Sequence, residues 1–353
     1  MEKTVYINGI GAVTAQGVWS DAIFDAAVEL REALNYAVQP AYKTGIPPAM
    51  LRRMSKGIKM GIFASQQALA DADIVEPDAI LMGTGLGCLE DSEKFLKNVL
   101  DNNEEFLTPT SFIQSTHNTV AAQIALRLGC KAYNFTYVNG ATSFESALID
   151  GLMQIQAAEA KTVLVGGMDE ISGQTFEFKQ LVGEINDKET FKSVKENTTT
   201  AVNFGEGGTF FGLSSDQNDR SYAALVDVKL INTLALREVA DFVVDFLVQN
   251  NVALTDVSAL IVGINGDIQA DSYYTTCAEL FNDNIPLLYY KHLVGHSDVA
   301  SAFGLALAAH CLKTQQIPAA VRWNEAPYKT LRYILCYNQY KGKAHSLTLL
   351  KSL

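Results

Sequence analysis

Val299–Leu312 restricts the fold more than any other segment, because it has the composition of a helix that is apolar on every side. Only Ser301 and His310 interrupt its run of alanine, leucine, phenylalanine and other small or apolar residues. A helix without a polar face must be covered on all sides. Thr142–Ala157 is a second helical pattern that is mostly apolar. Two buried helices predict a layered α/β/α/β/α body.

Short apolar runs alternate with helical patterns along the rest of the chain, which is typical of an α/β fold. The expected strands are Thr4–Ile7, Ala79–Met82, Asn134–Val138, Thr162–Gly166, Thr209–Leu213, Ala223–Ile231, Ala259–Gly263, Leu287–Tyr290, Leu331–Tyr337 and Ser346–Leu350. The other expected helices are Lys56–Ala72, Val120–Leu128, Leu236–Gln249 and Asp271–Phe281. The pattern repeats, so we expect two similar halves, residues 1–215 and 216–353.

The segment 172–200 departs from this pattern. It is polar, rich in Lys, Glu and Thr, and has little apolar periodicity. Long connections of this kind in a compact body are often functional. We expect the segment to be an excursion that caps the core.

The composition excludes several classes of protein. The formal net charge of -12 disfavours binding to nucleic acid or to anionic lipid, because like charges repel. The five cysteines, at positions 88, 130, 277, 311 and 336, form no CxxC pair and indicate reduced core residues in a cytoplasmic protein. We expect neither a signal peptide nor a membrane-spanning helix, and therefore a soluble protein.

Six segments, in order over nearly the whole chain, resemble the motifs of β-ketoacyl synthases. They are Val5–Thr14, Arg52–Met54 with the helix ending at Ala72, Gly83–Gly87, Gln123–Gly129, Gly205–Gly208 and Lys291–His296. The resemblance implies a thiolase-like fold. It also implies a catalytic Cys-His-His set and a lysine, with no cofactor and no metal.

The resemblance places Ala141 where the family carries its nucleophilic cysteine, in Val138–Ser143. An alanine cannot form an acyl-enzyme thioester. Thr142 and Ser143 are hydroxyl alternatives, but Thr142 and Glu145 also match a capping box at a helix start, which is the explanation we favour. The resemblance makes Thr142 a candidate substrate contact.

The other catalytic positions are partly retained. Asn265 falls on the first histidine position, and asparagine cannot exchange protons near neutral pH. Lys291 and His296 match the lysine and the second histidine. Gly295–His296 can equally persist because a helix begins there, with Ser297 or Asp298 as its cap.

The resemblance places the oxyanion-hole turn and its gating aromatic near residues 337–342. Only Tyr340 and Gly342 fit that pattern, and both are candidate substrate contacts. Gln339 and Lys341 replace small residues and argue against a working oxyanion hole. His117 and His310 have no neighbours at metal-ligand spacing.

Three functions remain open. The first is a non-condensing, chain-length-factor-like subunit that pairs with an active ketosynthase, although many such subunits carry Gln rather than Ala at the cysteine position. The second is a weakly active 3-oxoacyl synthase, decarboxylase or acyl transferase that uses Lys291 and His296. The third is a non-enzymatic scaffold that binds acyl groups or a carrier protein.

The resemblance also implies partners. Family members dimerise through an edge strand, here near Asn134–Val138, as homodimers or heterodimers. An acyl carrier protein is the expected macromolecular substrate, and because carriers are acidic it would dock on a basic patch. Arg52, Arg53, Lys56 and Lys59 form the densest basic cluster, although a solvated helix face is the explanation we favour for it.

Overall fold

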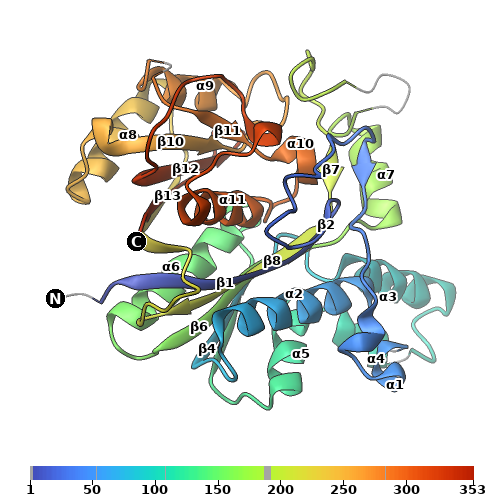
Figure 1. Cartoon of the computed structure of the whole chain (residues 1–353). Coiled ribbons are helices and arrows are strands. Elements are labelled where there is room, and N and C mark those ends of the chain that lie inside the picture. The colour runs from blue at the N-terminus through green and yellow to red at the C-terminus, as the bar shows by residue number, and fades with distance from the viewer. Residues whose placement is uncertain (1–2, 53, 108, 187–191, 283) are drawn as a thin grey trace.

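The computed structural model describes residues 3–52, 54–107, 109–186, 192–282 and 284–353. Its strands fall into two groups, with helices between the groups and on their outer sides (Figure 1). The predicted α/β class and layered arrangement are confirmed. Arg53 of the expected basic cluster lies outside the described residues, as do residues 187–191 of the expected excursion.

The first group of strands comes from the N-terminal part of the chain and has the order β1-β8-β6-β4-β5. Its bounds are β1 Val5–Thr14, β8 Gly207–Ser214, β6 Thr162–Asp169, β4 Ala79–Gly83 and β5 Tyr133–Tyr137. The short strand β2 (Gly17–Val18) pairs with β1, while β3 (Leu34–Asn35) and β7 (Phe204–Gly205) form a separate pair. Strand β5 ends the sheet, so one of its edges has no neighbour in the described chain.

The second group has the order β9-β13-β12-β10-β11. Its bounds are β9 Ala223–Asn232, β13 Ala344–Lys351, β12 Tyr333–Tyr340, β10 Val257–Val262 and β11 Leu287–Tyr289. The two groups are continuous, because β1 pairs with β9 over Val5–Ile7. The described strands therefore include one sheet of 11 strands that serves both halves.

Helices α6 (Ser143–Gln156) and α11 (Ser301–Thr314) lie between the two groups of strands, as Figure 1 shows. Both contribute to one central hydrophobic core with residues from both halves. The outer helices are α2 Lys56–Ala72 and α5 Thr119–Leu128 on the first half, and α8 Val239–Gln249 and α9 Ser272–Glu279 on the second. Eleven consecutive α11 residues from Ala302 to Leu312 are buried, as the apolar pattern predicted.

Gly9 and Gly11 do not end the first strand, contrary to the expectation of a strand confined to Thr4–Ile7. Strand β1 continues through both glycines to Thr14. Helix α2 crosses β1 so closely that an added Cβ on either glycine would overlap the helix backbone, at Ala68 and Ala64 respectively. These glycines therefore serve close helix–strand packing, which a pattern of turn residues does not reveal.

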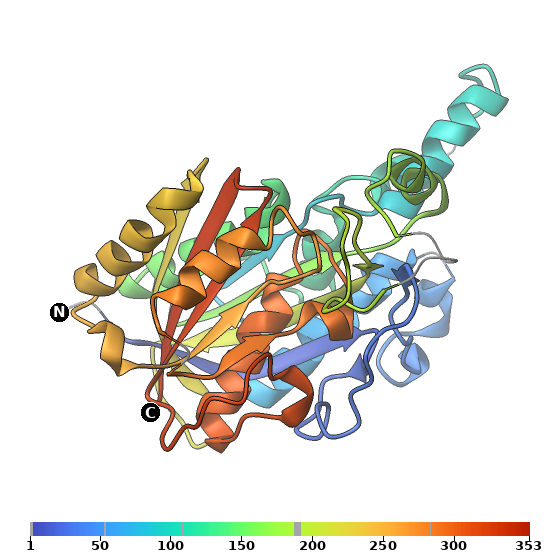
Figure 2. The same cartoon turned by 90° about the horizontal axis from the view of Figure 1, so that it is seen from above.

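Several helices carried no clear sequence signal. They are α1 Pro48–Leu51, α3 Leu89–Asp101, α4 Pro109–Gln114, α7 Gly173–Leu181 and α10 Lys291–Val294. Figure 2 shows α3 and the loop after it projecting away from the body. Helix α7 lies inside the expected excursion, and its Phe176 packs with Ile185, Val202 and Phe204 in a small separate core. In the described part of the chain, no helix has both the length and the hydropathy to cross a bilayer.

Candidate functional site

Ala141 lies at the tip of a sharp turn between β5 and α6. Gly140 adopts a left-handed conformation, with φ of 56°, and allows the turn to reverse. The Ser143 hydroxyl accepts a hydrogen bond from the Asn139 amide (2.8 Å) and donates one to the Gly140 carbonyl (2.7 Å). The turn that would present a nucleophile is thus fully formed, and it presents a methyl group.

The hydroxyls beside Ala141 are used by the turn itself. Thr142 Oγ1 donates to the Asn139 carbonyl at 3.2 Å. The predicted capping box is wrong, because Thr142 makes no side-chain cap bond. Glu145 instead faces β12 and β13, where its carboxylate accepts from Ser346 Oγ (2.9 Å) and Asn338 Nδ2 (3.3 Å). Burial raises the pKa of Glu145, so this side chain is an interior hydrogen-bonding group.

The structure brings together three of the predicted side chains. His296 Nδ1 lies 3.4 Å from Lys291 Nζ and 3.5 Å from Asn265 Nδ2. Both neighbours are donors, so we assign Nδ1 as the acceptor and place the imidazole proton on Nε2. Burial, with the nearby Lys291 charge, holds the pKa of His296 well below its usual value. The imidazole is therefore neutral and offers a hydrogen bond from Nε2.

The Asp271 carboxylate acts on both Lys291 and the loop that carries Asn265. Burial lowers the pKa of Lys291 to about 8, and the Asp271 carboxylate opposes that shift. Asp271 accepts hydrogen bonds from the backbone amides of Asn265 (3.2 Å) and Gly266 (2.8 Å). Burial raises the pKa of Asp271 to about 7. One carboxylate thus fixes the loop that carries Asn265 and stabilises the charge of Lys291.

A helix start does not explain Gly295–His296. Helix α11 begins at Ser301, and neither Ser297 nor Asp298 is its N-cap residue. The His296 amide donates to the Asn203 carbonyl (2.8 Å), and the Gly205 amide donates to the His296 carbonyl (3.0 Å). An added Cβ on Gly295 would overlap Gly205. The close approach of this segment to β7 requires the glycine and fixes the histidine.

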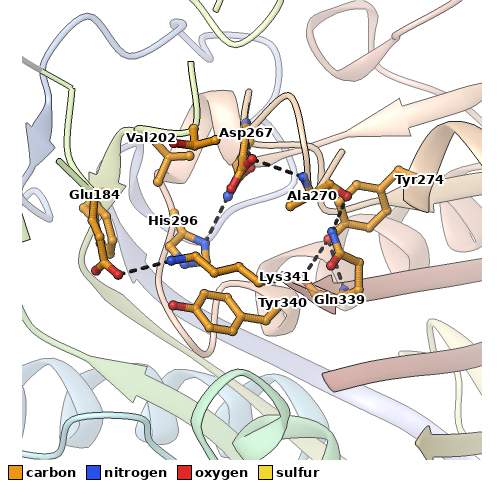
Figure 3. A pocket seen from close by; sticks show the side chains of 12 residues that line it. Glu184, Val202, Asp267, Ala270, Tyr274, His296, Gln339, Tyr340 and Lys341 are labelled. Atoms are coloured by element: carbon orange, nitrogen blue, oxygen red, sulfur yellow. Dashed lines mark hydrogen bonds and ion pairs between the residues drawn. The ribbon is translucent and has the colours of Figure 1, made fainter. Parts of the chain in front are cut away.

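The C-terminal turn places only one of its two candidate residues at the site. The Tyr340 ring stacks on His296, with ring centroids 5.9 Å apart and planes 6° apart (Figure 3). Gly342 (φ 66°) lies beside Tyr273. Gln339 spans the turn by donating to the Ala270 carbonyl (2.7 Å) and accepting from the Gly342 amide (3.1 Å). Gln339 therefore stabilises this turn.

Two cavities meet at His296. The larger has a volume of about 250 Å³ and the smaller about 30 Å³. Phe204, His296 and Tyr340 line both cavities; Ala141 lines the larger and Asn265 the smaller. Neither Thr142 nor Gly342 lines either one. Of the predicted substrate contacts, only Tyr340 faces these cavities.

Sequence reasoning did not foresee the charged groups that gather around the cavities. Asp169 and Asp298 line the larger cavity, and Asp169 is the last residue of the buried strand β6. Lys179 of α7 and Lys341 both pair with Glu184, at 2.9 Å and 3.1 Å, and Figure 3 shows the Lys341 pair. The only sequence signal for Asp169 was its position at the end of a strand. The only one for Asp298 was its position just after the Gly295–His296 motif.

The expected basic cluster is not a free docking patch. Lys56 Nζ lies 2.7 Å from both Glu90 Oε1 and Glu206 Oε2, and the Glu206 side chain is buried. Lys56 is thus a neutralised structural cation. Arg52 and Lys59 remain as the described surface cations of that cluster.

The arrangement supports hydrogen bonding, but the turn around Ala141 lacks a nucleophile for covalent catalysis. Ala141 offers no nucleophile, and His296 offers a neutral N–H donor. Among the described residues, no group of three or more His, Cys, Asp or Glu is placed to hold a metal ion. The chemistry available at Ala141 is therefore binding and orientation.

A family profile described as "Beta-ketoacyl synthase, N-terminal domain" matches residues 5–217, more than half of the chain. The chain belongs to the β-ketoacyl synthase family. A comparison of this sequence with curated proteins finds no match.

Solved structures with the same fold include ketosynthase and chain-length-factor assemblies. "The ishigamide ketosynthase/chain length factor" matches at a TM-score of 0.83 and 16% identity, with 100% of both chains covered. A type II PKS acyl-carrier protein in complex with its ketosynthase, AntDE:AntF, matches at 0.78 and 12%, again over 100% of both chains. The ketosynthase ApeO in complex with its chain length factor ApeC, from Xenorhabdus doucetiae, matches at 0.78 and 14%, covering 99% and 98%.

The methyl group of Ala141 at the tip of the turn predicts that the protein forms no acyl-enzyme at this position. After incubation with a radiolabelled acyl carrier protein, peptide mapping should find no covalent label in residues 139–143. Ala141→Cys is the positive control, because position 141 lines the cavity and a thiol there should react with iodoacetamide. Stoichiometric acyl label on this segment of the natural chain would contradict the assignment of Ala141.

Proposed function

We propose that this chain is a non-condensing subunit, similar to a chain length factor, that pairs with an active ketosynthase. Ala141 carries the proposal. The turn around Ala141 keeps the hydrogen bonds and the left-handed glycine that present a side chain to the cavity, while that side chain has lost its chemistry. A partner that supplies the cysteine accounts for a preserved fold with a missing nucleophile.

The edge strand β5 supports pairing. Tyr133, Phe135 and Val138 at this edge are 45%, 46% and 44% exposed, so apolar side chains accompany the open edge of the strand. Proteins rarely leave such an edge uncovered, because it pairs readily with another strand. We propose that the corresponding edge of the partner continues the sheet here, in a homodimer or a heterodimer, and that an acyl carrier protein delivers substrate to the pair.

A malonyl decarboxylase is a weaker candidate. Decarboxylation needs donors around the thioester carbonyl, and His296 Nε2 is one. The same cavity, however, is lined by three carboxylates, Asp169, Glu170 and Asp298, against one lysine, Lys179, and this excess of acidic groups disfavours a malonyl carboxylate. The acidic lining therefore favours a non-catalytic role over decarboxylation.

Reconstitution tests the proposal. The chain and a cysteine-containing ketosynthase from the same genome would be purified separately and together, and elongation of malonyl-carrier substrates measured by product mass. We expect no elongation by this chain alone and a gain in the pair in activity, solubility or product length. Cys→Ala in the ketosynthase should abolish all elongation.

Two results would overturn the proposal. Elongation by the chain alone would show that it condenses without a partner. A ketosynthase whose activity, solubility and product length are unchanged by this chain would show that the two do not work together. A scaffold role would then be favoured if the chain still captured a carrier protein.

A further inference from the structure

Lys341 lies in the turn between β12 and β13 in a backbone conformation that suits glycine better than lysine. Its φ is 49°, and the next residue, Gly342, has a φ of 66°. A residue with a side chain rarely adopts this left-handed conformation, because its Cβ approaches the following carbonyl oxygen too closely. The turn therefore carries a strained lysine where a second glycine would be free of strain. A backbone outlier of this kind indicates that the side chain itself is needed.

The side chain of Lys341 links this turn to the other half of the chain. Lys341 Nζ lies 3.1 Å from Glu184 Oε1, shortly after α7, as Figure 3 shows. Burial works to lower the pKa of Lys341, but the hydrogen bond with Glu184 outweighs it and raises that pKa. Glu184 is fixed on its own side. Lys179 Nζ lies 2.9 Å from its other carboxylate oxygen, and its carbonyl accepts from the Val202 amide at 3.0 Å.

The same ion pair covers the aromatic stack at the site. Lys341 Nζ lies over the Tyr340 ring, 5.3 Å from its centroid, and that ring stacks on His296. Tyr340 and His296 line both cavities, whereas Lys341 and Glu184 line the smaller one. His296 and Ala141 are only 5% and 8% exposed. The lysine thus lies over the ring that borders both cavities.

We propose that the Lys341–Glu184 ion pair is a closure for this site. While the pair is formed, it holds Tyr340 against His296 and restricts entry to both cavities. A ligand enters when the pair breaks and the two side chains above His296 move aside. The side chains of the pair are 44% and 31% exposed, so the pair is weak enough to open reversibly and salt screens it. The inference goes beyond the proposed function and does not rest on it, because the isolated chain contains every group involved.

Alkylation of an Ala141→Cys parent by iodoacetamide measures entry to the larger cavity. Mass spectrometry of the peptide that contains position 141 follows this thiol separately from the five natural cysteines. Iodoacetamide is neutral, and the plateau of the pH–rate profile removes any change in the pKa of the thiol. Glu184→Gln or Lys341→Met, added to the parent, breaks the pair but keeps the bulk of the side chain. Each should raise the plateau rate about threefold or more, as expected for the loss of an exposed ion pair.

Three further measurements separate this closure from other effects. Lys341→Arg keeps the charge and should react as slowly as the parent. Salt raised from about 0.01 M to about 1 M shortens the screening length from about 30 Å to about 3 Å, and it should accelerate the parent but not the variants that lack the pair. Asp256→Asn breaks a similar exposed pair, with Arg332 (3.1 Å) at the opposite end of β12, and should leave the rate unchanged.

The closure is disproved if Glu184→Gln and Lys341→Met react at the parent rate, or if salt accelerates them as much as it accelerates the parent. It is equally disproved if the two substitutions together multiply their separate effects, because two changes to a single pair remove one interaction only once. A rate raised to the same extent by Asp256→Asn would show a general loosening of the fold and would also exclude the closure.

Discussion

Replacing Phe135 by aspartate is expected to dissociate this chain from its partner. Phe135 lies on the edge strand β5 and is 46% exposed in the isolated chain, so the substitution should leave the fold intact. In a continued sheet the new carboxylate would be buried at the interface without a counter-charge. The dissociation constant should rise at least about 100-fold, or about 3 kcal/mol, as measured by light scattering over a dilution series.

Val248→Asp is the matched control for this experiment. Val248 is an exposed apolar residue on α8, which packs on the second half of the chain, whereas β5 ends the first. It should leave association unchanged. A natural chain that stays monomeric at micromolar concentration with its ketosynthase present, or a Phe135→Asp variant that associates normally, would show that β5 is not the interface.

Asp169→Asn is expected to stabilise the fold at pH 8 by about 2–4 kcal/mol. Burial, together with the Asp298 charge, raises the pKa of Asp169 from 3.8 to about 7. Folding therefore disfavours the ionised form, and stability is lost as pH rises from about 4 to about 7. Asparagine keeps the Oδ1 acceptor for its three donors and removes the buried charge.

Denaturant unfolding at pH 4, 6 and 8 checks the sign of this effect. The stabilisation should be small at pH 4, where Asp169 is neutral in the folded state, and largest at pH 8. Asp78→Asn should behave oppositely. Burial works to raise the pKa of Asp78, but hydrogen bonds from Thr162 and Lys161 outweigh it and lower that pKa, so the variant should lose stability at neutral pH. A pH-independent effect of Asp169→Asn would contradict the ionisation argument.

The sequence located the elements whose signal is local. Lys56–Ala72 was predicted with both ends correct, because helix formers and apolar spacing agree throughout it. The end of α5 was also visible, since Gly129 adopts the left-handed conformation (φ 70°) that stops a helix. The first strand was predicted to end at Ile7, before Gly9 and Gly11, because a helix packed across a strand leaves no local trace in the strand's own residues.

The same distinction applies to the site. Motif order alone singled out Ala141, Asn265, Lys291 and His296. In the fold, Ala141, Asn265 and His296 line two adjoining cavities, and Lys291 contacts His296. The role of Glu145 could not be read locally. Whether a glutamate near a helix start caps that helix or turns inward depends on which strands cover it, and here β12 and β13 do.

The sequence by itself determined the layered α/β body, the family and the alanine at position 141, because buried helices, ordered motifs and a side chain's identity are properties of the residues themselves. Only the tertiary structure decided the acidic lining of the cavity and the ion pairs of Glu184. Asp169 and Asp298 are far apart in the chain, and they meet because Gly85, which binds one carboxylate, lies against the other. Contacts between distant segments depend on how the layers stack, and no single segment encodes that stacking.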